Sequence, residues 1–358
     1  MKITKITKIS ILLLCLLLTL TGCTPQSDEP AESARGQPVT TTETERPRNN
    51  NTEAGSGENA FDNGAGITGV MEISVFGIGR SDAIVITTEN YTVMIDTGER
   101  RHGPPIVHHL FNRGISRIDY LIITHFDRDH VGGAYIIINY TDVKKVIVPN
   151  YSRDSNHVNR FEAALRANGL EAYVLTETMR FTLDNIEFTV DPSRLEYVHF
   201  ARYTDEHELY FYEAGGAAAA EETAAPPSGD DFSIVVSVTH GYNRFLFTGD
   251  AMAARLQELL ENEEIMNTGH DFLKMPRHGR HNARSIEFIH AVSPRYAVIT
   301  GFHPSDLARY YPERPADERV IAALDSVGAE VYFAMSTGVH VKSDGYEIGV
   351  TYRNFFAG

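Results

Sequence analysis

The chain has 358 residues, of which 42% are hydrophobic and 22% are charged. This balance is typical of a globular core and excludes a chain that is disordered throughout. The formal net charge of −16 gives no general support for nonspecific nucleic-acid binding, because such binding depends on neutralisation of phosphates by lysine and arginine. It does not exclude a local basic patch.

Residues 1–22 have the pattern of a secretory signal peptide. Three lysines precede a short apolar run, Ile11 to Leu20, which is too short to span a membrane comfortably. The run leads into Leu20-Thr21-Gly22-Cys23, which resembles a bacterial lipobox. We therefore expect lipid on Cys23 to hold the chain to the cell membrane, on its extracytoplasmic face. A plain signal peptide or a membrane anchor is the alternative.

The two cysteines of the chain both lie in this N-terminal segment. Cys15 would leave with the signal peptide, and Cys23 would be acylated. The mature domain would then have no thiol to form a disulfide or to bind a metal. Any metal must therefore be held by His, Asp and Glu.

Two segments are poor in large apolar residues. Residues 23–66 are rich in Pro, Ser, Thr, Asn, Glu and Gly, and we interpret them as a flexible tether between the lipid and a domain at residues 67–358. Residues 213–230 have a similar composition, and we interpret them as a flexible surface loop within that domain.

The rest of the domain alternates short apolar runs with amphipathic stretches. The strands expected are Met71–Phe76, Ala83–Thr87, Thr92–Ile95, Tyr120–Thr124, Lys145–Val148, Ile186–Val190, Ser233–Val238, Arg244–Phe247, Ala297–Thr300 and Glu330–Ala334. The helices expected are Pro105–Arg113, Ser155–Asn168, Ala251–Glu261, Ala283–His290 and Asp317–Val327. Mixed strands and helices, with enough helices to cover two sheets, predict a layered α/β sandwich.

The run His125-Phe126-Asp127-Arg128-Asp129-His130 carries the strongest chemical signal. It follows an apolar strand directly and precedes a glycine pair, Gly132-Gly133. A single histidine is more often a satisfied core or surface residue than a ligand. Four ligand-type side chains packed into six positions after a buried strand instead indicate a metal site.

This run resembles the signature of the metallo-β-lactamase fold superfamily. It is most similar to the variant in the C-terminal domain of ComEC-type competence proteins, which carry Asp where most of the superfamily has a second His. Further motifs of the family follow in the right order: Gly79-Arg80-Ser81-Asp82-Ala83, Ile95-Asp96-Thr97-Gly98, Asp231-Phe232-Ser233-Ile234-Val235, Phe247-Thr248-Gly249-Asp250, Leu273-Lys274-Met275-Pro276-Arg277-His278-Gly279 and His303-Pro304. The resemblance implies a four-layer αββα sandwich with metals at one edge, between the sheets.

The resemblance also implies roles for matching residues. The metal ligands it implies are His125, Asp127, Asp129, His130, Asp250 and His278, with Asp129 and Asp250 in the catalytic centre. His125 and Asp127 would bind a first ion, Asp129, His130 and His278 a second, and Asp250 would bridge both. Asp96 would brace the metal loop. Two divalent ions are expected, Zn²⁺ or Mn²⁺, because oxygen ligands favour harder ions while imidazole also suits zinc.

Some positions depart from the family pattern. Arg277 replaces the first His of its H-H-G motif, Arg280 replaces a Ser, and no residue before Ser233 clearly matches the usual third ligand of the first ion. Asp230 and Asp231 lie near that place. Arg277 and Arg280 fit a phosphate clamp, since guanidinium forks match phosphate geometry, or belong to a solvated helix start. His303 either contacts substrate or has a structural role.

The function predicted is hydrolysis of a phosphoester by a metal-bridged hydroxide, outside the cytoplasmic membrane. The substrate would be a nucleic acid such as DNA or a phosphodiester of the cell wall or of lipid. A lactone or amide substrate such as a β-lactam is a weaker alternative, because Asp127 replaces the second His of true β-lactamases. A further alternative is a catalytically silent, metal-binding lipoprotein that acts in DNA uptake or envelope assembly.

Overall fold

The computed structural model describes residues 69–200, 228–267, 269–304 and 315–356. The signal peptide, Cys23 and the tether lie outside the described residues, and so do residues 213–227 of the expected loop. Residues 228–230 of that loop belong to an ordered turn, the 3-10 turn η2 (Gly229–Phe232) with Ser228 at its N-cap. Within the described ranges, no helix is long and apolar enough to cross a membrane.

An eight-stranded sheet forms the first layer of the core. Its order is β17 (Ile348–Arg353), β16 (Gly338–Ser343), β1 (Met71–Val75), β2 (Ala83–Thr87), β3 (Thr92–Thr97), β4 (Arg117–Ile122), β5 (Asp142–Val148) and β7 (Ala172–Val174). The strands from β17 to β3 pair antiparallel, and those from β3 to β7 pair parallel. The parallel half therefore directs the carboxyl ends of its strands to one edge.

A seven-stranded sheet forms the second layer. Its order is β15 (Glu330–Phe333), β14 (Tyr296–Ile299), β13 (Phe272–Lys274), β12 (Asn243–Phe247), β11 (Val235–His240), β9 (Ile186–Asp191) and β8 (Met179–Leu183). The strands from β12 to β15 run parallel. A separate short pair, β6 (Ser152–Arg153) and β10 (His199–Phe200), is also parallel.

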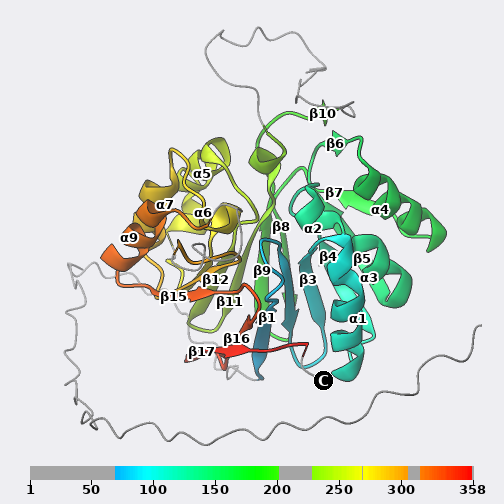
Figure 1. The fold of residues 1–358 in the computed structure, drawn as a ribbon, viewed down its shortest axis with the longest axis horizontal. Helices are drawn as coiled ribbons and strands as arrows, with labels where there is room; N and C mark the ends of the chain where they lie inside the picture. The colour runs from blue at the N-terminus through cyan, green and yellow to red at the C-terminus, as the bar shows by residue number, and fades with distance from the viewer. Residues whose placement is uncertain (1–68, 201–227, 268, 305–314, 357–358) are drawn as a thin grey trace, which may run out of the picture. The chain divides into compact units, whose positions relative to one another are not determined.

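Helices cover the outer face of each sheet (Figure 1). Those on the first sheet are α1 (Gly103–Asn112), α2 (Arg128–Val131), α3 (Ala134–Tyr140) and α4 (Asn156–Ala167), with the 3-10 turn η1 (Arg100–His102) before α1. Those on the second are α5 (Ala253–Leu260), α6 (Glu263–Met266), α7 (Ser285–Val292) and α9 (Glu318–Ser326). One apolar cluster lies between each sheet and its helices. A third, with Ile73 and Ile95 facing Phe188 and Phe245, fills the space between the sheets. The expected αββα sandwich is confirmed.

Each of the expected strands and helices has a counterpart, but some elements were missed. The segment Ala134–Tyr140 contains the run Ile136–Ile138, and such β-branched runs favour strands. It is nevertheless helical, because Ile137 and Ile138 are buried in the cluster between the helices and the first sheet. The edge strands β8 and β17 are largely exposed, so their hydrophobic patterns are weak. Tertiary packing decides these elements rather than local propensity.

Candidate metal centre

The candidate metal centre lies at the edge where parallel strands of both sheets end. His125 follows β4, Asp250 follows β12, and His278 follows β13, each within a few residues of the strand's last position. The carboxyl ends of neighbouring parallel strands open onto one edge of a sheet. Side chains from distant parts of the chain therefore converge there.

The run from His125 to His130 is folded back by α2. Asp127 stands at the N-cap of this single turn, and its carbonyl oxygen accepts the N–H of His130 at 3.0 Å. Gly133 allows the loop to approach the end of β3, because a Cβ at this position would lie 2.4 Å from the carbonyl oxygen of Thr97. The glycine pair after the run is therefore required by close backbone packing.

Three buried histidines turn one ring nitrogen into the centre. The Nδ1 atom of His130 lies 2.8 Å from Oδ2 of Asp96, and that of His278 lies 2.9 Å from Oγ1 of Thr300. The Nε2 atoms of His125, His130 and His278 are buried and have no hydrogen-bond partner among the described residues. Buried polar atoms without a partner are costly in a protein that has no ligand for them. This arrangement is typical of metal-binding histidines, whose other nitrogen is held by an outer partner.

Two carboxylates face these nitrogens. Asp250 places Oδ1 3.4 Å from Nε2 of His130 and Oδ2 3.3 Å from Nε2 of His278. Oδ2 of Asp129 lies 3.3 Å from the same nitrogen of His278. Ligand atoms of Asp129, His130 and His278 lie within 4.8 Å of one another, as do those of His125, His130 and Asp250. Imidazole and carboxylate atoms converging at these distances fit a divalent cation.

A second ligand group shares His125 with the first. Ligand atoms of His125, Asp127 and Asp230 are within 4.8 Å of one another. Each carboxylate also has an arginine partner: Arg153 forms an ion pair with Asp127, and Nε of Arg277 lies 3.1 Å from Oδ2 of Asp230. Arg153 belongs to no recognised sequence motif, so only the structure shows that it lies next to Asp127.

These features agree with the comparisons to known proteins. A family model described as the metallo-beta-lactamase superfamily matches residues 76–303. The chain belongs to this superfamily. ComE operon protein 3 of Bacillus subtilis is 24% identical over 247 residues, which are 64% of this chain and 28% of that protein. Competence protein ComA of Neisseria gonorrhoeae is 24% identical over 251 residues, which are 70% of this chain and 29% of that protein.

The chain thus spans less than a third of the length of these two relatives. Among solved structures, the metallo-beta-lactamase fold protein YhfI from Bacillus subtilis aligns with a TM-score of 0.46 at 12% identity, covering 77% of this chain and 100% of that chain. The expected superfamily and the resemblance to competence proteins are confirmed. Metal-dependent hydrolysis is the general activity that this superfamily membership indicates.

Lys274 and Asp82 form a buried ion pair next to the candidate metal ligand Asp250. The Lys274 ammonium is fully buried, forms an ion pair with Asp82 and lies 3.7 Å from Oδ1 of Asp250. It also donates to the Gly249 carbonyl at 2.9 Å, and Asp82 accepts from Thr300 Oγ1 at 2.6 Å. Both residues lie within motifs noted above, but the motifs alone do not show that they meet.

In the metal-free centre, burial lowers the pKa of His130 and His278, while the clustered carboxylates raise it. Burial alone lowers the pKa of His130, yet the carboxylates of Asp250 and Asp96 outweigh it and raise the pKa well above its usual range. The same competition raises the pKa of His278 to about 9. Burial and then its carboxylate neighbours raise the pKa of Asp230 to about 7. Protonated imidazoles therefore balance the carboxylates, and a metal must displace these protons.

The backbone at the centre is strained. Arg277 and His278 have φ values of 50° and 55°, and Asp96 has a φ of 56°. Residues other than glycine reach this left-handed region at a cost of about 1–3 kcal/mol each, and such residues concentrate at functional sites. The two consecutive residues Arg277 and His278 point a guanidinium and an imidazole to neighbouring parts of the centre.

Two other predicted residues, Arg280 and His303, have contacts with residues outside these ligand groups. Arg280 lines a pocket of about 600 Å³ together with Asp317 and Arg319. His303 packs edge-on against Phe333, with ring centroids 4.9 Å apart. The structure therefore does not place Arg280 or His303 within any of the metal-ligand groups, and a direct role in substrate binding stays a prediction for both.

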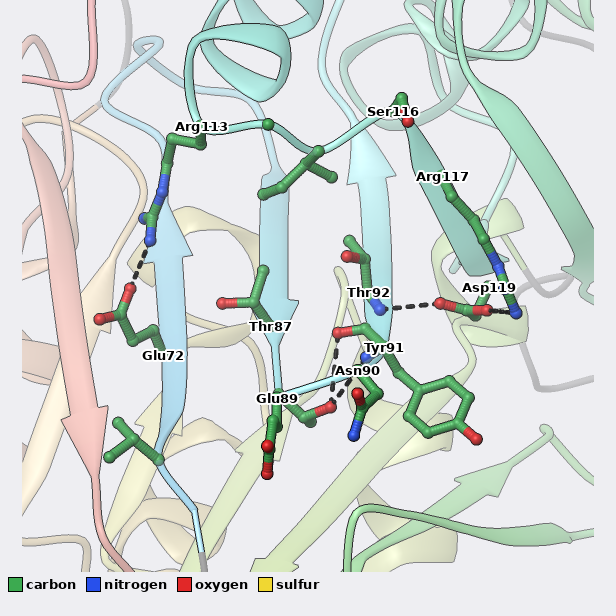
Figure 2. Close-up of a pocket in the computed structure, with 14 residues that line it drawn as sticks. Glu72, Thr87, Glu89, Asn90, Tyr91, Thr92, Arg113, Ser116, Arg117 and Asp119 are labelled. Carbon is green, nitrogen blue, oxygen red and sulfur yellow. Dashed lines mark hydrogen bonds and ion pairs between the residues drawn. The ribbon is translucent and has the colours of Figure 1, made fainter.

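A pocket of about 450 Å³ lies at the opposite end of the first sheet (Figure 2). It is formed where β1 and β4 begin and where β2 turns into β3, with Glu72 and Arg113 paired at 2.6 Å on one side. On its other side Asp119 accepts the N–H of Thr92 at 2.9 Å. Glu72 pairs with Arg113 and Asp119 pairs with Arg117, and none of the candidate metal ligands lines the pocket.

Proposed function

We propose that this protein is an exported, lipid-anchored phosphodiesterase that uses two divalent ions, Zn²⁺ or Mn²⁺. Lipid on Cys23 would hold it at the extracytoplasmic face of the cell membrane, and residues 23–66 would tether the hydrolase domain. Its membership of the metallo-beta-lactamase superfamily supports the metal-dependent hydrolysis. The signal-like residues 1–22 and the lipobox-like run Leu20-Thr21-Gly22-Cys23 support the export and the anchor.

The residues present fit the ions. Asp129, His130 and His278 would hold one ion, His125 and Asp127 would hold the other, and Asp250 would face both. Divalent ions at such a site lower the pKa of a bound water and neutralise the charge of a transferring phosphoryl group. Asp96 orients His130 by accepting from Nδ1, and thereby directs Nε2 into the centre.

The observation that carries the phosphoester proposal is the pair of arginines beside the carboxylates. Arg153 contacts Asp127, and Arg277 contacts Asp230. A guanidinium has five N–H donors, so each arginine can keep its carboxylate partner and still present N–H groups to an anion. Arginine binds phosphate in a fork that presents parallel N–H donors, whereas the reacting carbonyl of a lactam or lactone is uncharged and has no such requirement. The chain therefore favours a phosphoester over a β-lactam.

Within phosphoesters we favour nucleic acid as the substrate class. One relative is named as a competence protein and the other as a ComE operon protein, and the competence name supports a nucleic-acid substrate for the domain they share with this chain. The net charge of −16 argues against broad electrostatic binding, so contacts would be confined to the arginines at the centre.

A panel of substrates under one metal condition tests the proposal. The purified chain, loaded with Mn²⁺ or Zn²⁺, would be assayed against single-stranded DNA, a choline phosphodiester and a β-lactam. We expect cleavage of phosphodiesters and none of the β-lactam. Cleavage of the β-lactam alone would contradict the phosphoester assignment, and cleavage of the choline ester alone would exclude nucleic acid as the substrate.

A further inference from the structure

The first ion of the proposed pair lacks an evident third ligand in the sequence, yet the structure presents one. Nε2 of His125 belongs to a fully buried side chain and has no hydrogen-bond partner among the described residues. Oδ1 of Asp230 lies 3.7 Å from this nitrogen. A separation of this size is too long for a hydrogen bond but allows both atoms to bind one cation between them.

Asp230 is held in this position by an ordered turn. It lies in the 3-10 turn η2 (Gly229–Phe232), in which Asp231 accepts the N–H of Ser228 at 3.0 Å and closes a capping box. The position of Gly229 is also restricted, because a Cβ there would lie 3.1 Å from the Tyr151 hydroxyl oxygen. The backbone of this turn therefore determines the position of the Asp230 carboxylate.

Several carboxylates share ligand groups with His125. Ligand atoms of Asp127 and Asp230 lie within 4.8 Å of that of His125, and Asp250 belongs to another such group with His125. Arg153 pairs with Asp127, and Arg277 pairs with Oδ2 of Asp230, whereas Oδ1 of Asp230 is the oxygen that lies 3.7 Å from Nε2 of His125. A cation among the carboxylates would relieve their repulsion and give Nε2 of His125 a partner.

We propose that Asp230 is the third protein ligand of the first ion, so that the two metal sites have unlike ligand sets. This inference rests on the proposed function. The first site would consist of His125, Asp127, Asp230 and shared Asp250, which is one imidazole among carboxylates. The second site contains the imidazoles of His130 and His278. Because oxygen-rich sites favour harder ions, the first site selects Mn²⁺ relative to the second, which favours Zn²⁺.

Calorimetric titration of the metal-free full chain with Mn²⁺ and with Zn²⁺ tests the ligand assignment. The decisive variant is Asp230→Asn, which keeps the shape and removes the charge. Its matched control is Asp154→Asn, which removes one charge from an exposed carboxylate nearby. We expect Asp230→Asn to weaken binding at the Mn²⁺-selective site by more than about 100-fold, which exceeds the loss typical of an outer partner. Binding at the other site and in the control stays unchanged.

Two results would overturn the inference. One is a variant Asp230→Asn that binds both ions with the affinities of the unchanged chain. The other is a chain in which the ratio of Mn²⁺ affinity to Zn²⁺ affinity is the same at both sites. Because neither measurement uses turnover, failure of the proposed phosphodiesterase activity is a separate result: the chain would bind two unlike ions and cleave nothing.

A second variant guards against misfolding of Asp230→Asn. In Asp230→Cys the carboxylate becomes a thiolate, and the mature chain otherwise has only the proposed lipid-bearing cysteine. Cd²⁺ added to this variant should produce an ultraviolet charge-transfer band from sulfur to cadmium. The intensity of the band should correspond to one thiolate bound to each cadmium ion. If Cd²⁺ binds to the variant without this band, residue 230 is not a ligand.

Discussion

Oδ2 of Asp96 lies 2.8 Å from Nδ1 of His130, and the same carboxylate accepts the N–H and the hydroxyl of Thr124 at 2.8 and 2.7 Å. One buried carboxylate thus joins the end of β4 to the metal loop. It also determines which nitrogen of His130 is available to an ion, because the bonded nitrogen carries the proton. We consider Asp96 a positioning residue.

Replacement Asp96→Asn should therefore weaken binding of the second ion by about 10- to 100-fold. The amide keeps the contact to the Thr124 N–H but no longer supports a donor at Nδ1 of His130. Calorimetric Zn²⁺ titration measures the change. Asp119→Asn is the matched control, because Asp119 is also buried and accepts a backbone N–H at the far end of the sheet. Equal affinity in the two variants would count against the positioning role.

Lys274→Met should destabilise the metal-free protein strongly. The fully buried ammonium neutralises Asp82 and lies close to Asp250, so its removal leaves buried carboxylates uncompensated. Loss of one partner of a buried pair costs about 3–5 kcal/mol in the free energy of unfolding. Urea unfolding in the presence of chelator measures this. Lys342→Met, at an exposed position of β16, should change it by less than about 0.5 kcal/mol. A similar small change for Lys274→Met would contradict the account.

His270 should make the protein sensitive to mild acid. Burial, and then the charge of Arg244, lowers its pKa to about 4 from an ordinary value of 6.5. Because the folded state binds the proton less well than the unfolded state, stability is complete above about pH 6.5 and falls as the pH decreases towards 4. The shift corresponds to at most about 3 kcal/mol. His270→Gln should flatten this part of the pH profile of urea unfolding, while His290→Gln, at an exposed position, should not.

Arg277→Met should impair phosphodiester cleavage without loss of the metals. Hydrogen bonds to charged groups contribute about 1.5–3 kcal/mol, so kcat/KM should fall by about 10- to 100-fold. Arg284→Met serves as the control, because Arg284 is exposed and pairs with Glu287 on α7. If Arg277→Met leaves kcat/KM at the level of this control, Arg277 does not bind the phosphoryl group.

The sequence was informative where ligands stand in local motifs. The run His125 to His130 could be recognised because its ligand-type residues follow a buried strand, and Asp250 and His278 lie in family motifs. The pair of Asp82 and Lys274 could not be predicted, because it depends on how the first sheet packs against the second. The sequence placed Asp230 and Asp231 near the missing third ligand but could not choose between them, because their segment resembled a flexible loop in composition, whereas a capping box orders it.

We propose that the centre binds two divalent ions and uses them to cleave phosphoesters. The most direct test measures metal content together with turnover of bis-p-nitrophenyl phosphate, for the unchanged chain and for Asp250→Ala. We predict two ions and turnover in the first, and in the folded variant a loss of about 10³-fold or more, as expected when a member of a catalytic unit is removed. A chain that binds no Mn²⁺ or Zn²⁺ and shows no turnover, or an Asp250→Ala variant of unchanged activity, would contradict this claim.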